Sequence, residues 1–192
     1  MTLPNFVAIE GVDGVGKTTL ARRLEKDFGY KYVYPVPSPY DLIRKQVEGL
    51  GDIEARFWYY LAGNVTLQRE LKQMIGLGTR VVLDRYIYST MASHQAMGAT
   101  VDCVELSKVP YMVPSLAILL TCAPEIRNIR IVSRGLETQV YVNREGSILD
   151  ETERLLRGYS LKTIDTTELT KEQVFVTAQR LLFGESKKGE LC

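Results

Sequence analysis

Five short apolar segments alternate along the chain with longer segments whose apolar residues recur at helical spacing. The short segments are expected to be β-strands and cover Phe6–Glu10, Lys31–Tyr34, Arg80–Asp84, Ser115–Thr121 and Ser160–Asp165. Val81–Leu83 and Leu116–Leu120 are apolar without a break, which is typical of strands covered on both faces. Alternation of such strands with helices predicts an α/β protein, a five-stranded parallel sheet with helices on both faces.

The longest helical segment is expected to run from about Ile53 to Ile75. Its apolar and aromatic residues repeat at intervals of three or four, and Gly76 and Gly78 are expected to end the helix. This repeat places Asn64 on the inward face. A shorter amphipathic helix is expected over Thr19–Phe28.

Composition limits the classes of protein to consider. With 192 residues, 45% of them apolar, the chain suits one globular domain over 1–183, followed by a polar tail over 184–192. A net charge of +1 gives no basic field, so neither nucleic acid nor a membrane surface is an expected partner, whereas small anionic ligands stay open. Unpaired Cys103, Cys122 and Cys192, without a signal peptide or apolar span, favour a soluble cytoplasmic protein.

Residues 11–18 read Gly-Val-Asp-Gly-Val-Gly-Lys-Thr and match the phosphate-loop pattern G-x-x-x-x-G-K-[ST]. A predicted strand precedes the loop and a predicted helix follows it, which is the context that a triphosphate site needs. Backbone N–H groups and the helix N-terminus favour an anion there, Lys17 can reach the β- and γ-phosphates, and Thr18 can hold Mg²⁺. The residues expected to bind the nucleotide are Gly11, Val12, Asp13, Gly14, Val15, Gly16, Lys17, Thr18 and Thr19.

A second polar group, Asp84-Arg85-Tyr86, directly follows the third predicted strand. Ligands of open α/β sheets bind beyond the carboxyl ends of strands, so this tripeptide and the phosphate loop are expected to face one crevice. Asp84 can organise Mg²⁺ or its waters, and the planar guanidinium of Arg85 suits a phosphate. The alternative is a structural Asp–Arg pair that closes a turn.

Four arginines lie between Pro124 and Arg144, in a segment expected to begin as a helix and to carry a lid over about 134–147. Arginines on a lid can neutralise charge that develops during phosphoryl transfer. Arg134, beside the hinge-like Gly135, is the best candidate for that role, and Arg130 is expected to bind the nucleotide. Arg127 and Arg144 are interpreted as part of a solvent-facing surface.

In order and spacing, these motifs resemble the thymidylate kinase family over nearly the whole chain. The resemblance rests on Glu10–Thr19, Asp84-Arg85-Tyr86-x-x-Ser89, Pro124-Glu125 leading to Arg134-Gly135, Arg157-Gly158-Tyr159 and Ile164-Asp165. It implies a homodimeric P-loop kinase that uses Mg²⁺ and moves the γ-phosphate of ATP onto a nucleoside monophosphate, preferentially dTMP. Because Gly14 stands where some members carry an arginine, the resemblance implies that the catalytic arginine comes from the lid, in agreement with Arg134.

Carried over position by position, the resemblance assigns residues to the acceptor nucleotide. It places Asp13 near the sugar 3′-hydroxyl and phosphate, Arg85 on the acceptor phosphate, and the Tyr60 ring on the base; packing in the core is the alternative for Tyr60. Ser89 belongs to the same motif and is also expected at the acceptor.

Three acceptor-site residues depart from the family pattern. Asn64 replaces an arginine that contacts the pyrimidine, and Ser93-His94 replace an aromatic residue at the deoxyribose and the Gln or Thr after it. An amide can donate and accept, so Asn64 suits thymine, uracil or cytosine. His94 receives no proton-transfer role, because a phosphate nucleophile is already anionic.

Two other functions remain open at this stage. A deoxynucleoside kinase shares the sheet and the phosphate loop, but it acts on a neutral 5′-hydroxyl and needs a base, for which Glu10 is the first candidate. A nucleotide-binding switch or an inactive relative is the other possibility. The chain has no Asn-Lys-x-Asp stretch that would favour a GTPase switch.

Overall fold

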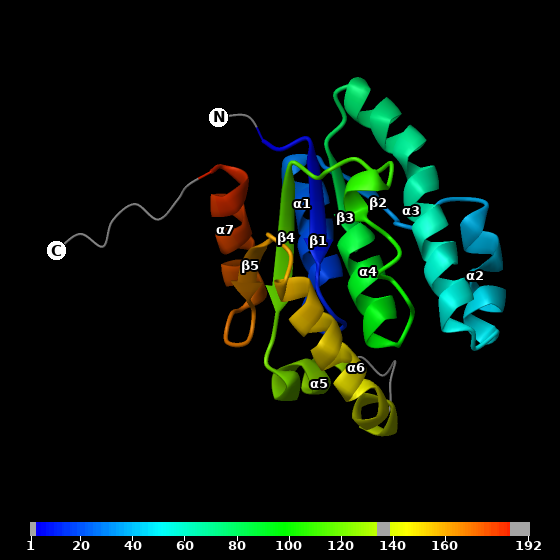
Figure 1. The fold of residues 1–192 in the computed structure, drawn as a ribbon. Coiled ribbons are helices and arrows are strands. Elements are labelled where there is room, and N and C mark those ends of the chain that lie inside the picture. Colours follow the sequence, from blue (N-terminus) through cyan, green and yellow to red (C-terminus); the bar gives the residue numbers. More distant parts are fainter. Residues whose placement is uncertain (1–2, 134–138, 185–192) are drawn as a thin grey trace.

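The structure, a computed structural model, describes residues 3–133 and 139–184, and it describes the side chains of the helix that begins at Gln139 only from Gly146 onward. Figure 1 shows the fold. The elements are β1 (Phe6–Glu10), α1 (Lys17–Phe28), β2 (Lys31–Val33), α2 (Tyr40–Gly49), α3 (Ile53–Gly76), β3 (Val81–Asp84), α4 (Ile87–Ala96), the 3₁₀ turn η1 (Leu106–Lys108), β4 (Leu116–Thr121), α5 (Pro124–Val132), α6 (Gln139–Arg157), β5 (Lys162–Asp165) and α7 (Lys171–Leu182).

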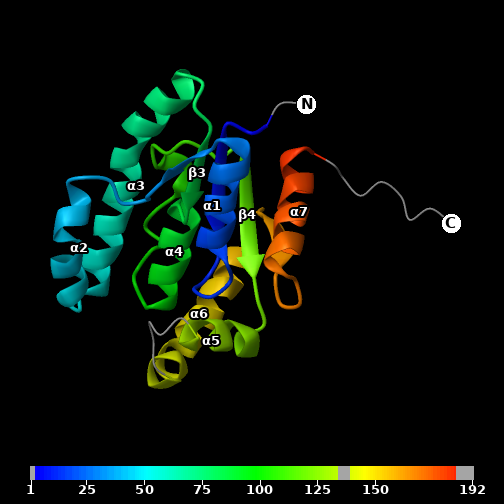
Figure 2. The ribbon, with the colours of Figure 1, turned by 180° about the vertical axis from the view of Figure 1, so that it is seen from behind.

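The five strands form one parallel sheet in the order β2-β3-β1-β4-β5. Successive side chains of a strand point to opposite faces, so β1 supplies both layers of the core. Val7 and Ile9 pack toward α1 and α7, whereas Phe6 and Ala8 pack toward α3 and α4. Figure 1 shows α4 in front of the sheet, and Figure 2, the view from behind, shows α1 in front of the opposite face. The predicted fold class is confirmed.

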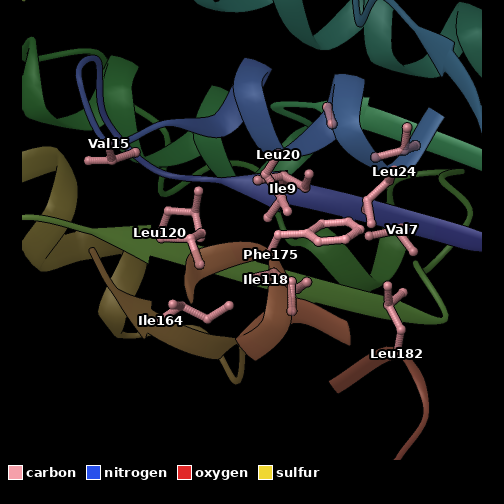
Figure 3. Close-up of a cluster of buried hydrophobic side chains, with 14 of the residues drawn as sticks. Val7, Ile9, Val15, Leu20, Leu24, Ile118, Leu120, Ile164, Phe175 and Leu182 are labelled. Carbon is pink, nitrogen blue, oxygen red and sulfur yellow. The ribbon is translucent and has the colours of Figure 1, made fainter. Parts of the chain in front are cut away.

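The core between the sheet, α1 and α7 is continuous up to the phosphate loop. Figure 3 shows Ile9 of β1 beside Leu20 of α1, with Phe175 of α7 between Ile9 and Ile118 of β4. Val12 and Val15, within the loop itself, are each 1% exposed and belong to the same cluster. Two buried side chains therefore anchor the loop to the core.

The predicted strands agree with the observed ones to within two residues at each end. The helix predicted over Ile53–Ile75 is observed as α3, and Asn64 lies inward with 2% of its surface exposed. Helix α2 was not predicted. The apolar residues Ile43, Val47 and Leu50 do recur at helical spacing, but none of the residues of α2 is buried in the fold.

The carboxyl ends of β1 and β3 lie side by side, because Ile9 pairs with Asp84 in the sheet. The loop after β1 and the Asp84-Arg85-Tyr86 segment after β3 therefore share one edge, as predicted. In the part of the chain that the structure describes, no helix is long and apolar enough to cross a membrane.

Candidate active site

Glycines give the phosphate loop its path between β1 and α1. Gly11 has φ 137°, and a Cβ there would lie 2.4 Å from the carbonyl oxygen of Leu120 in β4. Gly16 has φ 102° and is the N-cap of α1. Both backbone conformations are ones that side chains rarely adopt, and at Gly11 a side chain would also collide with backbone. The loop thus delivers its N–H groups to the N-terminus of α1, where an anion is stabilised.

Lys17 lies in the first turn of α1 with its ammonium turned back onto the loop. Nζ donates to the carbonyl oxygen of Val12 at 2.7 Å and lies 3.8 Å from the Asp13 carboxylate. Burial, and secondarily the nearby Arg85 cation, lower the pKa of Lys17 to about 8. The side chain is therefore still mostly protonated at neutral pH. Phosphates in the loop would replace the Val12 carbonyl as its partner.

A cavity of about 1060 Å³ opens in front of the loop. Its size suits a nucleotide, and its lining carries the cationic side chains of Lys17, Arg22, Arg23, Lys26, Arg130 and Lys171. Arg130 is fixed against the segment after β5, where it donates to the carbonyl oxygen of Thr166 at 2.8 Å and to the Thr166 hydroxyl at 3.0 Å. This position at the cavity wall suits the nucleotide-binding role predicted for Arg130.

Thr18 and Asp84, the residues predicted to hold Mg²⁺, are in direct contact. The Thr18 hydroxyl donates to the Asp84 carboxylate across the ends of α1 and β3. Both groups are oxygen donors of the kind that Mg²⁺ takes, and Mg²⁺ usually needs only one or two carboxylates beside phosphates and water. The residues fit the ion on that basis. No group of three or more acidic, His or Cys side chains suited to a metal occurs among the described residues.

Arg85 faces the phosphate loop from the end of β3. It has φ 72°, the one positive φ among the described residues other than glycine. Its backbone N–H donates to the Ile9 carbonyl oxygen at 2.9 Å, and its Nη2 atom lies 2.5 Å from Asp13 Oδ1. Unfavourable backbone conformations of this kind tend to persist at functional sites. The turn aims the guanidinium across the crevice at Asp13.

A second group of predicted site residues lies between α3 and α4. The Asn64 amide donates from Nδ2 to the Tyr60 carbonyl oxygen at 2.9 Å and to the Thr90 hydroxyl at 2.8 Å. Its Oδ1 atom is buried and has no hydrogen-bond partner among the described residues. Since both donors are used, Asn64 offers a ligand an acceptor only.

His94 is buried on α4 beneath the ring of Tyr60. Nδ1 lies 2.7 Å from the Thr90 carbonyl oxygen, so this nitrogen carries the proton and Nε2 is an acceptor, without a partner in the described chain. Burial lowers the pKa of His94 to about 4. The ring is neutral at physiological pH, in keeping with the absence of a proton-transfer role. Tyr60 lies with its ring centroid 5.4 Å from that of His94.

The other residues predicted to bind the acceptor nucleotide form hydrogen bonds within the protein. The half-buried Tyr60 donates its hydroxyl to Glu48 of α2, and Ser93 donates to the carbonyl oxygen of Ser89 at 2.7 Å. The Ser89 hydroxyl donates to Glu10 at the end of β1. This last bond connects the acceptor-side helix α4 to the strand that leads into the phosphate loop.

The arginine segment differs from the sequence interpretation. Arg127 was predicted to face solvent, and this is wrong: it is 1% exposed, because its stem packs against Gly14 and its guanidinium pairs with Asp150 of α6. Arg134 lies outside the described residues, as does the side chain of Arg144. Of the predicted lid, 134–138 lie outside the described residues, and the backbone from Gln139 onward is helix α6.

Thr90 was missed by the sequence interpretation, although it contacts both Asn64 and His94. Its hydroxyl accepts from Asn64, and its carbonyl oxygen accepts from His94. The available signal was its spacing, since Thr90 lies one helical turn before His94 and directly after Ser89. A threonine within an apolar helix gives no other indication of function.

Comparisons with known proteins agree with this geometry. The family model described as thymidylate kinase matches residues 9–177. A thymidylate kinase of Xylella fastidiosa (strain 9a5c) is 36% identical over 144 residues, which cover 68% of this chain and 67% of that protein. A probable thymidylate kinase of Archaeoglobus fulgidus is 32% identical over 139 residues, covering 68% and 70% of the two chains.

A solved structure of thymidylate kinase from Candida albicans shares the fold. It aligns with a TM-score of 0.74 and 16% sequence identity, covering 96% of this chain and 93% of that one. At that identity the likeness concerns the fold alone, whereas the family model spans the phosphate loop, Asp84-Arg85-Tyr86 and the arginine segment together. The chain therefore belongs to the thymidylate kinase family.

Proposed function

We propose that this protein transfers the γ-phosphate of ATP to the phosphate of dTMP and releases ADP and dTDP. The observation that carries the proposal is the pairing of two phosphate-binding groups at neighbouring strand ends. Lys17 serves the loop after β1, and Arg85 faces that loop from the end of β3, joined to it through Asp13. Membership of the thymidylate kinase family supports ATP as the donor and a nucleotide as the acceptor.

Each cation is held by a partner that a phosphate can replace. Lys17 leaves the Val12 carbonyl for the β- and γ-phosphates, and Arg85 leaves Asp13 for the acceptor phosphate. Thr18 and Asp84 would hold Mg²⁺, which neutralises phosphate charge when bound. The acceptor oxygen is already anionic, so positioning and electrostatic stabilisation suffice without a strong base.

The acceptor base is assigned to the residues of α3 and α4 around Tyr60 and Asn64. The Tyr60 ring offers a stacking surface, and Asn64 Oδ1 offers an acceptor to the N3–H of thymine. Asp13 is assigned to the sugar 3′-hydroxyl side, beside Arg85. Ser93 and His94 are assigned to the deoxyribose, as the family resemblance implies.

The surroundings of Glu10 favour a monophosphate acceptor over a nucleoside. A nucleoside kinase needs a base that can reach a 5′-hydroxyl. Glu10 has no exposed surface and accepts from Ser89, and burial raises its pKa. Its carboxylate is thus withdrawn from the crevice. A monophosphate acceptor makes no such demand.

The substrate is tested by ADP release with each pyrimidine monophosphate and each pyrimidine nucleoside in turn. We expect turnover with dTMP and none with thymidine. Turnover of thymidine without dTMP would replace the proposal by a nucleoside kinase. ADP release that is independent of any acceptor would indicate hydrolysis and contradict transfer to a nucleotide.

Asn64 is expected to leave the base specificity broad. Its free Oδ1 accepts equally from the N3–H of thymine or uracil and from the 4-amino group of cytosine. The wild type should therefore also phosphorylate dCMP, and Asn64→Arg, whose guanidinium only donates, should raise the ratio of kcat/KM for dTMP over dCMP. The KM for ATP is the internal control. Wild-type rejection of dCMP and UMP by more than ~10⁴-fold would refute this reading, because such ratios require dedicated polar contacts.

We further propose that Arg134 stabilises the transferring phosphoryl group, as the family resemblance and the glycine at position 14 imply. Arg134→Ala is expected to lower kcat by ~10²-fold or more, while the Kd values of dTMP and a non-hydrolysable ATP analogue stay nearly unchanged, because the contact forms mainly in the transition state. Arg144→Ala is the comparison variant. A larger kcat loss in Arg144→Ala would move the role to that residue.

The proposal includes a cytoplasmic homodimer that consists of a single kinase domain over 1–183 with a lid at about 134–147, and no nucleic-acid partner. These features rest on composition and on the family resemblance, and they stay predictions.

A further inference from the structure

Arg127 of α5 is a buried cation next to the phosphate loop. It is 1% exposed and is one of the largest fully buried side chains in the described chain. Charged groups are almost never fully buried unless they are paired. Nη1 donates to Asp150 Oδ1 of α6 at 2.9 Å, Nε lies 3.4 Å from Asn128 Oδ1, and Nη2 has no partner among the described residues.

Gly14 makes room for this arginine. A Cβ on Gly14 would lie 2.8 Å from Arg127 Cγ, 2.9 Å from the Arg127 carbonyl oxygen and 3.1 Å from Ile131 Cγ1. Gly14 itself lines the cavity in front of the loop. The arginine stem therefore packs directly behind the loop wall whose front is assigned to the phosphates.

The charge of Arg127 is only partly compensated. Among the described residues its one carboxylate partner is Asp150, which keeps 54% of its side chain exposed, so solvent screens the acid more than the buried guanidinium. A charge in a low-dielectric interior acts over several ångströms. The Arg127–Asp150 pair thus adds a positive contribution, from outside the loop, to the field on the cavity side of the loop.

We propose that Arg127 strengthens the binding of the nucleotide's phosphates through space, as a fixed cation behind the loop, and that Asp150 weakens this effect. The inference rests on the proposed function, since it assigns the cavity to a polyphosphate. The effect of removing the Asp150 charge distinguishes this role from that of a purely structural ion pair. If Arg127 acts through space, the loss of that charge strengthens phosphate binding, whereas the loss of a structural ion pair would weaken it.

The test measures the Kd of tripolyphosphate and of ADP for the full chain at low ionic strength. Asp150→Asn keeps an oxygen that accepts from Arg127 but removes the negative charge. Glu151→Gln is the matched control, because it removes one charge from the same helix at a residue paired with the exposed Arg154. We expect Asp150→Asn to bind tripolyphosphate about fivefold more tightly than Glu151→Gln does, with a difference that shrinks as salt is added.

Arg127→Met, which fills the space without the charge, is expected to bind tripolyphosphate about fivefold more weakly, while the Kd of adenosine, which has no phosphate, stays unchanged in all variants. Should Arg127→Met fail to fold, Asp150→Asn decides alone. Equal or weaker binding of tripolyphosphate by Asp150→Asn, relative to Glu151→Gln, overturns the inference. A wild type that binds neither tripolyphosphate nor ADP overturns the proposed function as well, so the two failures are distinct.

Discussion

Lys17→Ala is expected to lower kcat at least a hundredfold in a protein that stays folded. The backbone of the loop still binds phosphates in this variant, but the mobile ammonium beside the transferred group is gone. A hundredfold loss corresponds to roughly 3 kcal/mol of activation free energy. The effect is measured as kcat at saturating ATP and dTMP, with far-UV circular dichroism as the check on folding.

Lys26→Ala is the matched control for this variant. Lys26 lies in the last turn of the same helix and lines the same cavity, but it is exposed and distant from the loop in sequence. Its replacement should leave kcat close to that of the wild type. If Lys17→Ala retained more than a tenth of wild-type kcat, the assignment of the phosphate loop as the reaction centre would be wrong.

Removal of the Arg85 guanidinium should weaken dTMP binding ~100-fold or more and ATP binding only slightly. A charge-assisted contact in a closed site is worth a few kcal/mol, and Arg85 does not line the cavity that Lys17 and Arg130 line. The two ligands are titrated separately by calorimetry. Equal weakening of both, or weakening of ATP alone, would contradict the role of Arg85 as the clamp of the acceptor phosphate.

Two substitutions of Arg85 distinguish the effect of losing its side chain from the effect of disturbing its backbone conformation. With φ 72°, Arg85 has a left-handed conformation that costs an alanine about 1 kcal/mol and a glycine nothing. Arg85→Gly therefore removes the guanidinium without opposing the turn. Similar losses of dTMP affinity in Arg85→Ala and Arg85→Gly would assign the effect to the guanidinium, whereas near-normal binding by Arg85→Gly would assign it to the backbone.

The centre of the sheet could be predicted from the sequence because the strands β1, β3 and β4 are largely buried on both faces. Such a strand is a continuous apolar run in the sequence and can be recognised without knowing which residues it packs against. Strands β3 and β4 are the clearest cases. Helix α2 shows the limit of this signal. The apolar residues Ile43, Val47 and Leu50 recur at helical spacing but are not buried, and the contacts of α2 with α3 include a polar one between Glu48 and Tyr60.

The site also has one part formed by residues that are contiguous in the sequence and another formed by contacts between distant residues. The phosphate loop is one contiguous motif, so its residues could be named in advance. The environment of Arg127 depends on Gly14, more than a hundred positions earlier, whereas the sequence shows only an arginine in a helix, and such arginines usually face solvent. Likewise, the Thr90 contact that fixes the Asn64 amide joins two helices and became visible only in the fold.

The central claim is most directly tested by following the γ-phosphate of labelled ATP. Wild-type protein is incubated with Mg²⁺, γ-labelled ATP and unlabelled dTMP, and the products are separated by chromatography. The pairing of Lys17 and Arg85 across the crevice predicts that the label appears in dTDP, in equal amount to the ADP released. Label found only in inorganic phosphate, or transfer to thymidine but not to dTMP, would contradict it.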